Sequence, residues 1–115
     1  MEPVQYHFEK LPISNGNHVV TRLEGKIGLE SVNQFLQTMR AEPAPYLIFD
    51  MSGVTFLDSA GVGALVQLLV HRRNNGKKFA LVSLTKQSYA VLQVAGLMKL
   101  LPVFSTVEEA IAQHT

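Results

Sequence analysis

Two residues that could do chemistry stand side by side in the stretch FLDSAGVGAL, residues 56–65: the carboxylate of Asp58 and the hydroxyl of Ser59. Either side chain makes a good helix N-cap, because its oxygen can accept a hydrogen bond from a free N–H group of the first turn. A serine at such a place is also a candidate for covalent modification. The apolar run that follows predicts a helix beginning at Asp58 or Ser59.

Two glycines, Gly61 and Gly63, stand inside the first turns of this predicted helix. A glycine in a helix interior costs about 1 kcal/mol relative to alanine, so their presence indicates a need other than helix stability. They could leave bare backbone and a small apolar patch, Val62 included, that another protein can approach closely. Alternatively, one of them packs inward against a sheet.

The chain offers little support for a metal site or a hydrolase. The four histidines fall on separate predicted elements without metal-ligand spacing: His7, His18, His71 and His114. A nucleophile elbow needs the pattern Gly-x-Ser-x-Gly, whereas Leu57 and Asp58 precede Ser59. We therefore expect no metal and no Ser-His-Asp chemistry.

A nucleotide-binding enzyme is a third hypothesis, and it rests on the Gly-Val-Gly of residues 61–63. A dinucleotide fingerprint needs a third glycine, but Val66 stands at that position. Such a fingerprint also directly follows a strand, whereas the strand that we predict before these glycines ends at Asp50. No carboxylate ends the next strand at Ser83. We expect no cofactor and no enzymatic activity.

The composition describes one small domain whose partners are proteins. The chain has 115 residues, of which 47% are hydrophobic, and its formal net charge of +1 does not predict nucleic-acid binding. No apolar run approaches the ~20 residues of a membrane span, and Met1-Glu2-Pro3 does not resemble a secretory signal. The absence of cysteine fits a reducing compartment. These features favour a cytoplasmic protein.

Hydrophobic periodicity predicts the elements of the first half. Alternating residues predict strands over 4–9 and 19–23, paired as a hairpin through turn residues Pro12, Asn15 and Gly16, with the second strand ending near Gly25. Residues 29–39 have the spacing of an amphipathic helix, whose apolar face begins with Leu29. The apolar run 46–49 predicts a central strand that ends at Asp50.

The second half continues the alternation of helices and strands. The helix that begins at Asp58 or Ser59 closes near Gly76, and 79–82 is a parallel strand, so residues 46–82 form a β-α-β unit. A basic cluster stands at its end: His71, Arg72, Arg73, Lys77 and Lys78. This cluster could bind an acidic partner, but complementarity to the helix dipole already explains half of it, and we favour that explanation. Thr85 caps a helix ending at Gly96, 103–104 is a possible strand, and the capping-box spacing of Thr106 and Glu109 opens a last helix. The expected fold is α/β, with a mixed central sheet of about four to five strands and about four helices.

The stretch DMSGVTFLDSAGVGAL, residues 50–65, resembles the signature of STAS domains, particularly of bacterial anti-sigma factor antagonists. The positions that match it are Asp50, Ser52, Asp58, Ser59 and Gly61. RLEGKI (22–27) is similar to the family's second-strand motif, and AGLMKLLPVF (95–104) to its segment before the last helix. The resemblance implies a single STAS-like domain over residues 1–115.

In that family the serine after the aspartate is phosphorylated by an anti-sigma factor that is also an ATP-dependent serine kinase, and a serine phosphatase can restore it. The resemblance places the phosphoacceptor on Ser59, and it implies that the unphosphorylated protein binds the kinase and frees a sigma factor. The partner-binding residues it implies are Gly28, Asp58, Ser59, Ala60, Gly61, Val62, Gly63 and Leu65, with Asp50 and Ser52 supporting the motif.

Two positions depart from the family pattern. Ala60 replaces a second serine, which leaves the phosphoacceptor in place, and Gly28 stands where many antagonists have an aspartate near the phosphorylation site. Gly28 therefore motivates an alternative function, a constitutive STAS scaffold in a transporter-ATPase or signalling complex without phosphoswitching.

Overall fold

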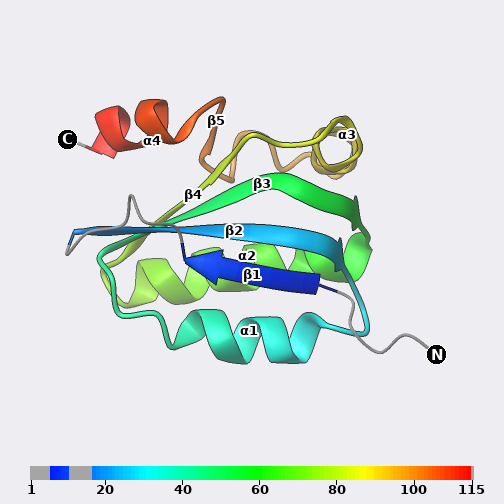
Figure 1. Cartoon of the computed structure of the whole chain (residues 1–115), viewed down its shortest axis with the longest axis horizontal. Helices are drawn as coiled ribbons and strands as arrows, with labels where there is room; N and C mark the ends of the chain where they lie inside the picture. Colours follow the sequence, from blue (N-terminus) through cyan, green and yellow to red (C-terminus); the bar gives the residue numbers. More distant parts are fainter. Residues whose placement is uncertain (1–5, 11–16, 115) are drawn as a thin grey trace.

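Five strands form one mixed sheet in the computed structural model, which describes residues 6–10 and 17–114. The strands stand side by side in chain order: β1 (Tyr6–Lys10), β2 (His18–Ile27), β3 (Tyr46–Leu57), β4 (Lys78–Val82) and β5 (Val103–Phe104). The β1–β2 pair is antiparallel and the three other pairs are parallel. This arrangement, drawn in Figure 1, confirms the predicted α/β fold with a mixed sheet.

Within the described residues, four helices cover the sheet unequally: α1 (Val32–Arg40), α2 (Ser59–Asn74), α3 (Lys86–Val94) and α4 (Val107–His114). Figure 1 shows α1 and α2 on one face, α4 on the other, and α3 near the end at which β3 finishes. The main core lies under α1 and α2, where the Phe49 ring contacts Phe35 and Phe79 at centroid distances of 5.7 and 5.2 Å. No helix of the described residues is long and apolar enough to cross a membrane.

The antiparallel pairing of β1 with β2 confirms the predicted hairpin. Val4 of its first strand and the turn residues Pro12, Asn15 and Gly16 lie outside the described residues. The second strand does not end near Gly25 but continues to Ile27. Gly25 has a φ of 90°, and the register with β3 shifts beside it. A glycine at positive φ in a strand is typical of a β-bulge, which bends a strand without ending it.

The central strand β3 is much longer than predicted, since it passes Asp50 and ends at Leu57. Gly53 resembles a turn residue in the sequence, but its missing side chain allows β2 and β3 to approach closely. A Cβ atom there would lie 2.8 Å from Cγ of Glu24 and 3.0 Å from the carbonyl oxygen of Leu23. The strand therefore delivers its carboxyl end directly to Asp58.

The first helix begins later than the periodicity predicts. Leu29 does not lie on the buried face of α1; it precedes the helix and 73% of it is exposed. The helix itself buries Phe35, Leu36 and Met39, as its apolar spacing predicts. The turn before α1 thus leaves a large apolar side chain in solvent, close to the loop between β3 and α2.

Both later helix caps follow the sequence prediction. The Thr85 hydroxyl accepts a hydrogen bond from the Ser88 N–H at 3.1 Å, and the Thr106 hydroxyl accepts one from the Glu109 N–H at 3.1 Å. The Glu109 carboxylate reaches back one residue beyond the expected partner, accepting from the Ser105 N–H at 2.8 Å. These caps define the starts of α3 and α4.

Arg72 is a buried cation at the end of α2, with only 1% of its surface exposed. Its guanidinium donates hydrogen bonds to the carbonyl oxygens of Lys78 at 2.8 Å, Ala44 at 2.7 Å and Glu42 at 3.3 Å. Burial lowers the pKa of Arg72, and the nearby Glu42 acts in the opposite direction. Arg72 therefore ties the end of α2 to the starts of β3 and β4, a structural role that the sequence does not reveal.

Arg72→Met should lower the free energy of unfolding by about 2–4 kcal/mol, because three carbonyl groups would lose their donor. Urea denaturation followed by circular dichroism measures the change. Arg73→Met is the matched control, since Arg73 is exposed, and it should change the free energy by less than about 0.5 kcal/mol. Equal effects of the two substitutions would contradict a structural role for Arg72.

Candidate functional site

Asp58 is the N-cap of α2, and its carboxylate joins two parts of the chain. Oδ1 accepts a hydrogen bond from the Gly61 N–H at 2.9 Å, and Oδ2 accepts one from the Leu29 N–H at 3.2 Å. The Asp58 N–H in turn donates to the Ile27 carbonyl oxygen at 3.3 Å. The carboxylate thus fastens the loop after β2 to the first turn of α2, which leaves Ser59 as the first helical residue.

Gly28 lies directly against the Asp58 carboxylate. A Cβ atom at position 28 would lie 2.7 Å from Cγ and 2.9 Å from Oδ1 of Asp58, closer than such contacts allow. A hydrogen bond from the Gly28 N–H to the buried Ser31 hydroxyl, at 3.2 Å, also holds this loop. Gly28 is therefore next to the predicted phosphorylation site, and its lack of a side chain provides the space that Asp58 occupies.

The two glycines of α2 have different environments. Inward packing against the sheet explains Gly61, whereas uncovered backbone that a partner can approach explains Gly63. A Cβ atom at Gly61 would overlap the Ile27 carbonyl oxygen and lie 2.8 Å from Cδ1 of Leu57, whereas one at Gly63 would meet no atom within 4 Å. Gly61 therefore packs inward and lets α2 begin against β2. At Gly63 a side chain would have room, and the absence of one leaves the backbone uncovered one turn after Ser59.

The end of β3 is also fastened to α3, through one glutamine side chain. The Leu57 N–H donates to Oε1 of Gln87 and Nε2 of Gln87 donates to the Leu57 carbonyl oxygen, both at 2.9 Å. The amide of Gln87 thus pairs with β3 as a neighbouring strand would. This pair of bonds fixes α3 beside the start of α2, and no motif in the sequence indicates it.

Ser59 itself is exposed, and no hydrogen bond joins its hydroxyl to another described residue. The Gly61 N–H donates to the Asp58 carboxylate. In the same turn, the N–H groups of Ser59 and Ala60 have no acceptor among the described residues. The positive end of a helix dipole favours an anion at such a place. The serine is therefore accessible to another protein, and its environment can accept a phosphate.

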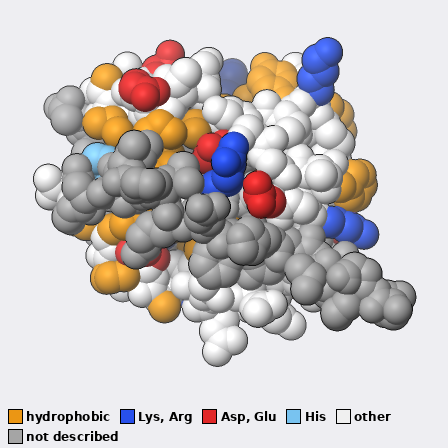
Figure 2. Space-filling view, in the orientation of Figure 1, with side chains coloured by type: hydrophobic (Ala, Val, Ile, Leu, Met, Phe, Trp, Pro, Cys, Tyr) orange, Lys and Arg blue, Asp and Glu red, His pale blue; other side chains and the backbone are white. Residues whose placement is uncertain are grey.

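An apolar hollow of about 420 Å³ opens beside Ser59, between α2 and α3. Its lining residues are Ser59, Val62, Ala90, Val91, Val94 and Ala95. Val94 has 89% of its surface exposed, an unusual position for a large apolar residue. We call this hollow, together with Ala60 and Gly63 of α2 and with Leu29, whose N–H is bonded to Asp58, the Ser59 surface. Figure 2 shows hydrophobic side chains exposed at the right-hand end of the molecule.

The structure narrows the predicted partner-binding set. Leu65 is fully buried, so including it in a contact surface is wrong, and Gly61 and Val62 are almost entirely covered. These residues support the surface from below, while Ser59, Ala60 and Gly63 retain exposure. The prediction also lacks the α3 residues, although the apolar side chains on several faces of residues 89–95 indicate that this helix has more than one contact surface.

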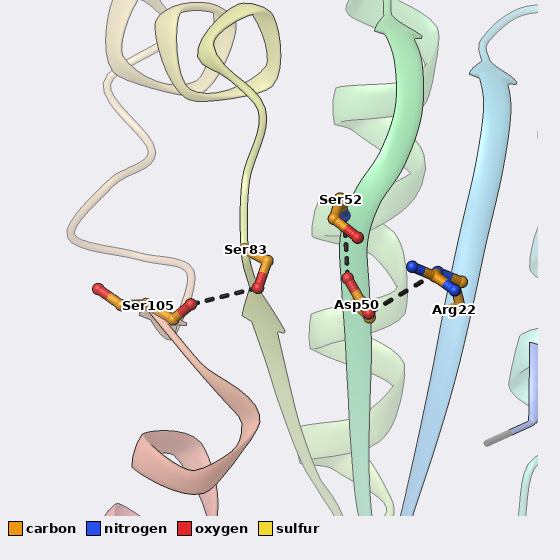
Figure 3. Close-up of polar contacts among 5 residues, drawn as sticks. All are labelled: Arg22, Asp50, Ser52, Ser83 and Ser105. Carbon is orange, nitrogen blue, oxygen red and sulfur yellow. Dashed lines mark hydrogen bonds and ion pairs between the residues drawn. The ribbon is translucent and has the colours of Figure 1, made fainter.

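Asp50 and Ser52 lie in the middle of β3, away from Ser59. Oδ1 of Asp50 accepts a hydrogen bond from the Ser52 N–H at 3.0 Å, and Oδ2 lies 3.9 Å from Nε of Arg22 on β2. Figure 3 shows these residues near Ser83 and Ser105, whose side chain and carbonyl oxygen are joined at 3.2 Å. Asp50 and Ser52 therefore shape the strand and do not contact the Ser59 surface.

The structure corrects one argument against a dinucleotide site. The glycines do follow a strand closely, since β3 ends at Leu57 and α2 begins at Ser59. Two other features oppose the site. The described strands keep chain order, with no point among them where strand order reverses, and the Asp58 carboxylate is already bonded to the Gly61 N–H that a pyrophosphate would need. Among the described residues, no cluster of His, Asp or Glu could hold a metal ion.

Gly61→Ala should destabilise the fold by about 1–3 kcal/mol, because its methyl group would force α2 away from β2. Gly63→Ala is the matched control, with free space at its side chain and a gain in helix propensity of up to about 1 kcal/mol. Chemical denaturation of both variants measures the difference. A stabilising Gly61→Ala would show that close packing is not why the glycine stands there.

Gly28→Ala and Asp58→Ala should each cost about 1–2 kcal/mol and should not be additive. An alanine at position 28 displaces the Asp58 carboxylate, so it can do little further harm once that carboxylate is removed. A double-mutant cycle by urea denaturation should give a coupling of about 1 kcal/mol. Additivity within about 0.3 kcal/mol would mean that Gly28 does not act through Asp58.

Comparison with solved structures places this fold among known proteins. An anti-sigma factor antagonist from Mycobacterium paratuberculosis aligns over 93% of both chains with a TM-score of 0.76 and 22% identity. The unphosphorylated form of the anti-sigma factor antagonist SpoIIAA aligns over 93% of this chain and 95% of its own, also with a TM-score of 0.76 and 22% identity. At these identities the likeness shows a shared fold.

The same fold also occurs inside transporters. A murine Solute Carrier 26 anion transporter aligns over 88% of this chain and 18% of its own length, with a TM-score of 0.76 and 24% identity. The family model for the STAS domain matches residues 11–110, which include the whole of β2 to β5 and the Ser59 surface. The chain therefore belongs to the STAS domain family.

Proposed function

We propose that this chain is an anti-sigma factor antagonist, a protein-binding switch released by phosphorylation of Ser59. Its partner would be an anti-sigma factor with serine kinase activity, and a serine phosphatase would return it to the binding state. The observation that carries the proposal is the exposed Ser59 at the start of α2, at the rim of an apolar hollow. The aligned antagonists have the same fold, and one of them, SpoIIAA from Bacillus, has a structure described as the phosphorylated form.

The proposed switch follows from the two effects of a phosphate at this position. A phosphoryl group adds about −1.5 to −2 charges, and the helix dipole and free N–H groups favour it by about 0.3–2 kcal/mol in the isolated domain. In a docked complex the same dianion would face an apolar surface without a partner, at a cost of about 2–5 kcal/mol. Phosphorylation would therefore dissociate the complex and leave the domain folded.

The proposed role is regulatory and needs no enzyme activity or cofactor in this chain. The carboxylate of Asp58 beside Ser59 accepts two backbone hydrogen bonds, which give it a structural role at the start of α2. Anti-sigma factors and the sigma factors that they hold act in the cytoplasm, so the chain would act there as well. Its net charge of +1 fits a protein partner better than nucleic acid.

Ser59→Asp should weaken binding to the cognate anti-sigma kinase by about 30-fold or more, because it places a charge on the docking surface. Ser59→Ala should bind as the parent does and should not be phosphorylated. Isothermal titration calorimetry measures binding, and thermal unfolding should show little change in either variant.

Gln67→Glu serves as the control for added charge, because Gln67 is exposed on the same helix and its side chain contacts Arg40 instead of the Ser59 surface. It should bind like the parent. If Ser59→Asp binds as tightly as Gln67→Glu, Ser59 is not at the interface and the switch is refuted.

A constitutive STAS scaffold is the second candidate, favoured by Gly28 and by the transporters that contain this fold. In that case the Ser59 surface would hold a transporter ATPase or a signalling subunit permanently. Phosphopeptide mapping of the protein from its own host distinguishes the two. Phosphate on Ser59 that changes with growth condition supports the switch, whereas unmodified Ser59 together with co-purified transporter subunits supports the scaffold.

A further inference from the structure

The outer edge of β4 is only half covered by its neighbour. β5 pairs with Leu81 and Val82 and with no earlier residue of β4. The Leu81 N–H donates to the Pro102 carbonyl oxygen at 2.9 Å, and the Ser83 N–H donates to that of Phe104 at 3.4 Å. The pairing therefore stops at Leu81, and the first half of β4 forms an edge of the sheet within the described residues.

Proline is the reason why the pairing stops there. In a parallel ladder the next donor to the Phe79 carbonyl would be the N–H of residue 102, which is Pro102 and has none. Because the Lys78 N–H points to β3, where it donates to the Pro45 carbonyl oxygen, alternation points the Phe79 N–H to the open edge. Neither backbone group of Phe79 has a partner on that side among the described residues, and only 3% of the residue is exposed, so a further strand would have to lie directly against this edge to pair with it.

A hollow of about 460 Å³ lies along this edge. Its apolar lining comes from both sides of the sheet and includes Leu69 of α2, Phe79, Pro102 and Phe104. Arg73, Lys77 and Lys78 complete the lining with three cations, and none of the described lining residues is acidic. The hollow thus combines an unpaired strand edge, apolar contact area and positive charge.

The basic turn between α2 and β4 is held in place before any partner arrives. Arg72 bonds three carbonyl oxygens around it, and the Lys77 N–H donates to the Arg72 carbonyl oxygen at 2.8 Å. Glu42, the acidic residue that acts on Arg72, already accepts a hydrogen bond from the Ala44 N–H at 2.9 Å. Complementarity to the helix dipole explains cations at the end of α2, but not why they surround a hollow at an open strand edge.

We propose that this hollow binds an extended acidic peptide segment of a partner protein, which adds to β4 as a short strand. The partner backbone pairs with Phe79, and its side chains, which alternate between the two sides of the sheet, contact the cations and the apolar lining of the hollow. Such strand addition draws affinity from main-chain hydrogen bonds and specificity from alternating side chains.

This second surface is separate from the Ser59 surface. The two lie near opposite ends of α2, whose 16 residues span about 24 Å at 1.5 Å per residue. A partner on one surface leaves the other accessible, so the protein can bind two segments at once. The proposal does not depend on the phosphorylation of Ser59.

NMR titration of the full chain with a synthetic peptide tests the proposal. The probe is an acetylated, amidated heptapeptide in which three glutamates alternate with valines between terminal serines. We expect shifts concentrated at the amides of Lys78, Phe79 and Phe104, slower hydrogen exchange of the Phe79 amide, and no change at Ser59. Shifts that gather at Ser59, or none at β4 with millimolar peptide, would overturn the proposal.

Main-chain pairing is tested by N-methylating the peptide at either of two adjacent central residues. In a strand, neighbouring N–H groups point in opposite directions, so one methylated peptide should lose binding and the other should keep it. Equal binding of both peptides would refute strand addition. Equal shifts with free glutarate or with a short RNA would show that the hollow binds anions in general, and they would overturn the proposal of a peptide site.

The double variant Arg73→Gln, Lys78→Gln should bind the glutamate peptide about fivefold to tenfold more weakly. The double variant Lys86→Gln, Lys99→Gln is the matched control, since it removes the same charge from exposed residues elsewhere on the surface. It should bind as the parent does. If both double variants weaken binding equally, net charge and not this hollow attracts the peptide.

Discussion

The two hydrogen bonds accepted by the Asp58 carboxylate determine the geometry of the candidate site. One bond fixes the first turn of α2, and the other fixes the loop after β2 that carries Leu29. The Asp58 N–H also donates to the Ile27 carbonyl oxygen, and β2 pairs with β3 as far as Ile27 and Leu57, so this side chain completes a junction that the backbone begins. Gly28 is part of the same constraint, because only a residue without a side chain leaves the carboxylate its place.

Close packing on one side of α2 explains why its start is exposed on the other. Gly61 brings the helix against the Ile27 carbonyl, so Val62, Ala64 and Leu65 are buried. The remaining side of the first turn then carries only small groups, those of Ser59, Ala60 and Gly63. A small surface beside an apolar hollow suits contact with another protein, and a single phosphate is large enough to change it.

The order and type of the elements could be predicted from the sequence, because periodicity and caps are local signals. The sequence predicts that α2 begins at Asp58 or Ser59, and it predicts the cap at Thr85 and the parallel β3-α2-β4 unit. The structure makes Asp58 the N-cap of α2 and has the other two features. Signals that depend on neighbouring strands could not be interpreted locally. Gly25 resembles a strand end but is a bulge, and β3 continues past its predicted end at Asp50 through Gly53, where β2 and β3 lie in close contact. The α3 side of the Ser59 surface depends on Gln87 pairing with β3, across 30 residues of sequence.

The same distinction between local and distant signals applies to the basic end of α2. In sequence, five neighbouring basic residues form one cluster, half of which the helix dipole explains. In space they separate, because Arg72 turns inward to three carbonyl oxygens while Arg73, Lys77 and Lys78 surround a strand edge. That edge exists because Pro102, more than 20 residues later, has no N–H to continue the ladder. The buried Arg72 and the distant Pro102 thus turn a charged helix end into a hollow at a strand edge, with the remaining cations around it.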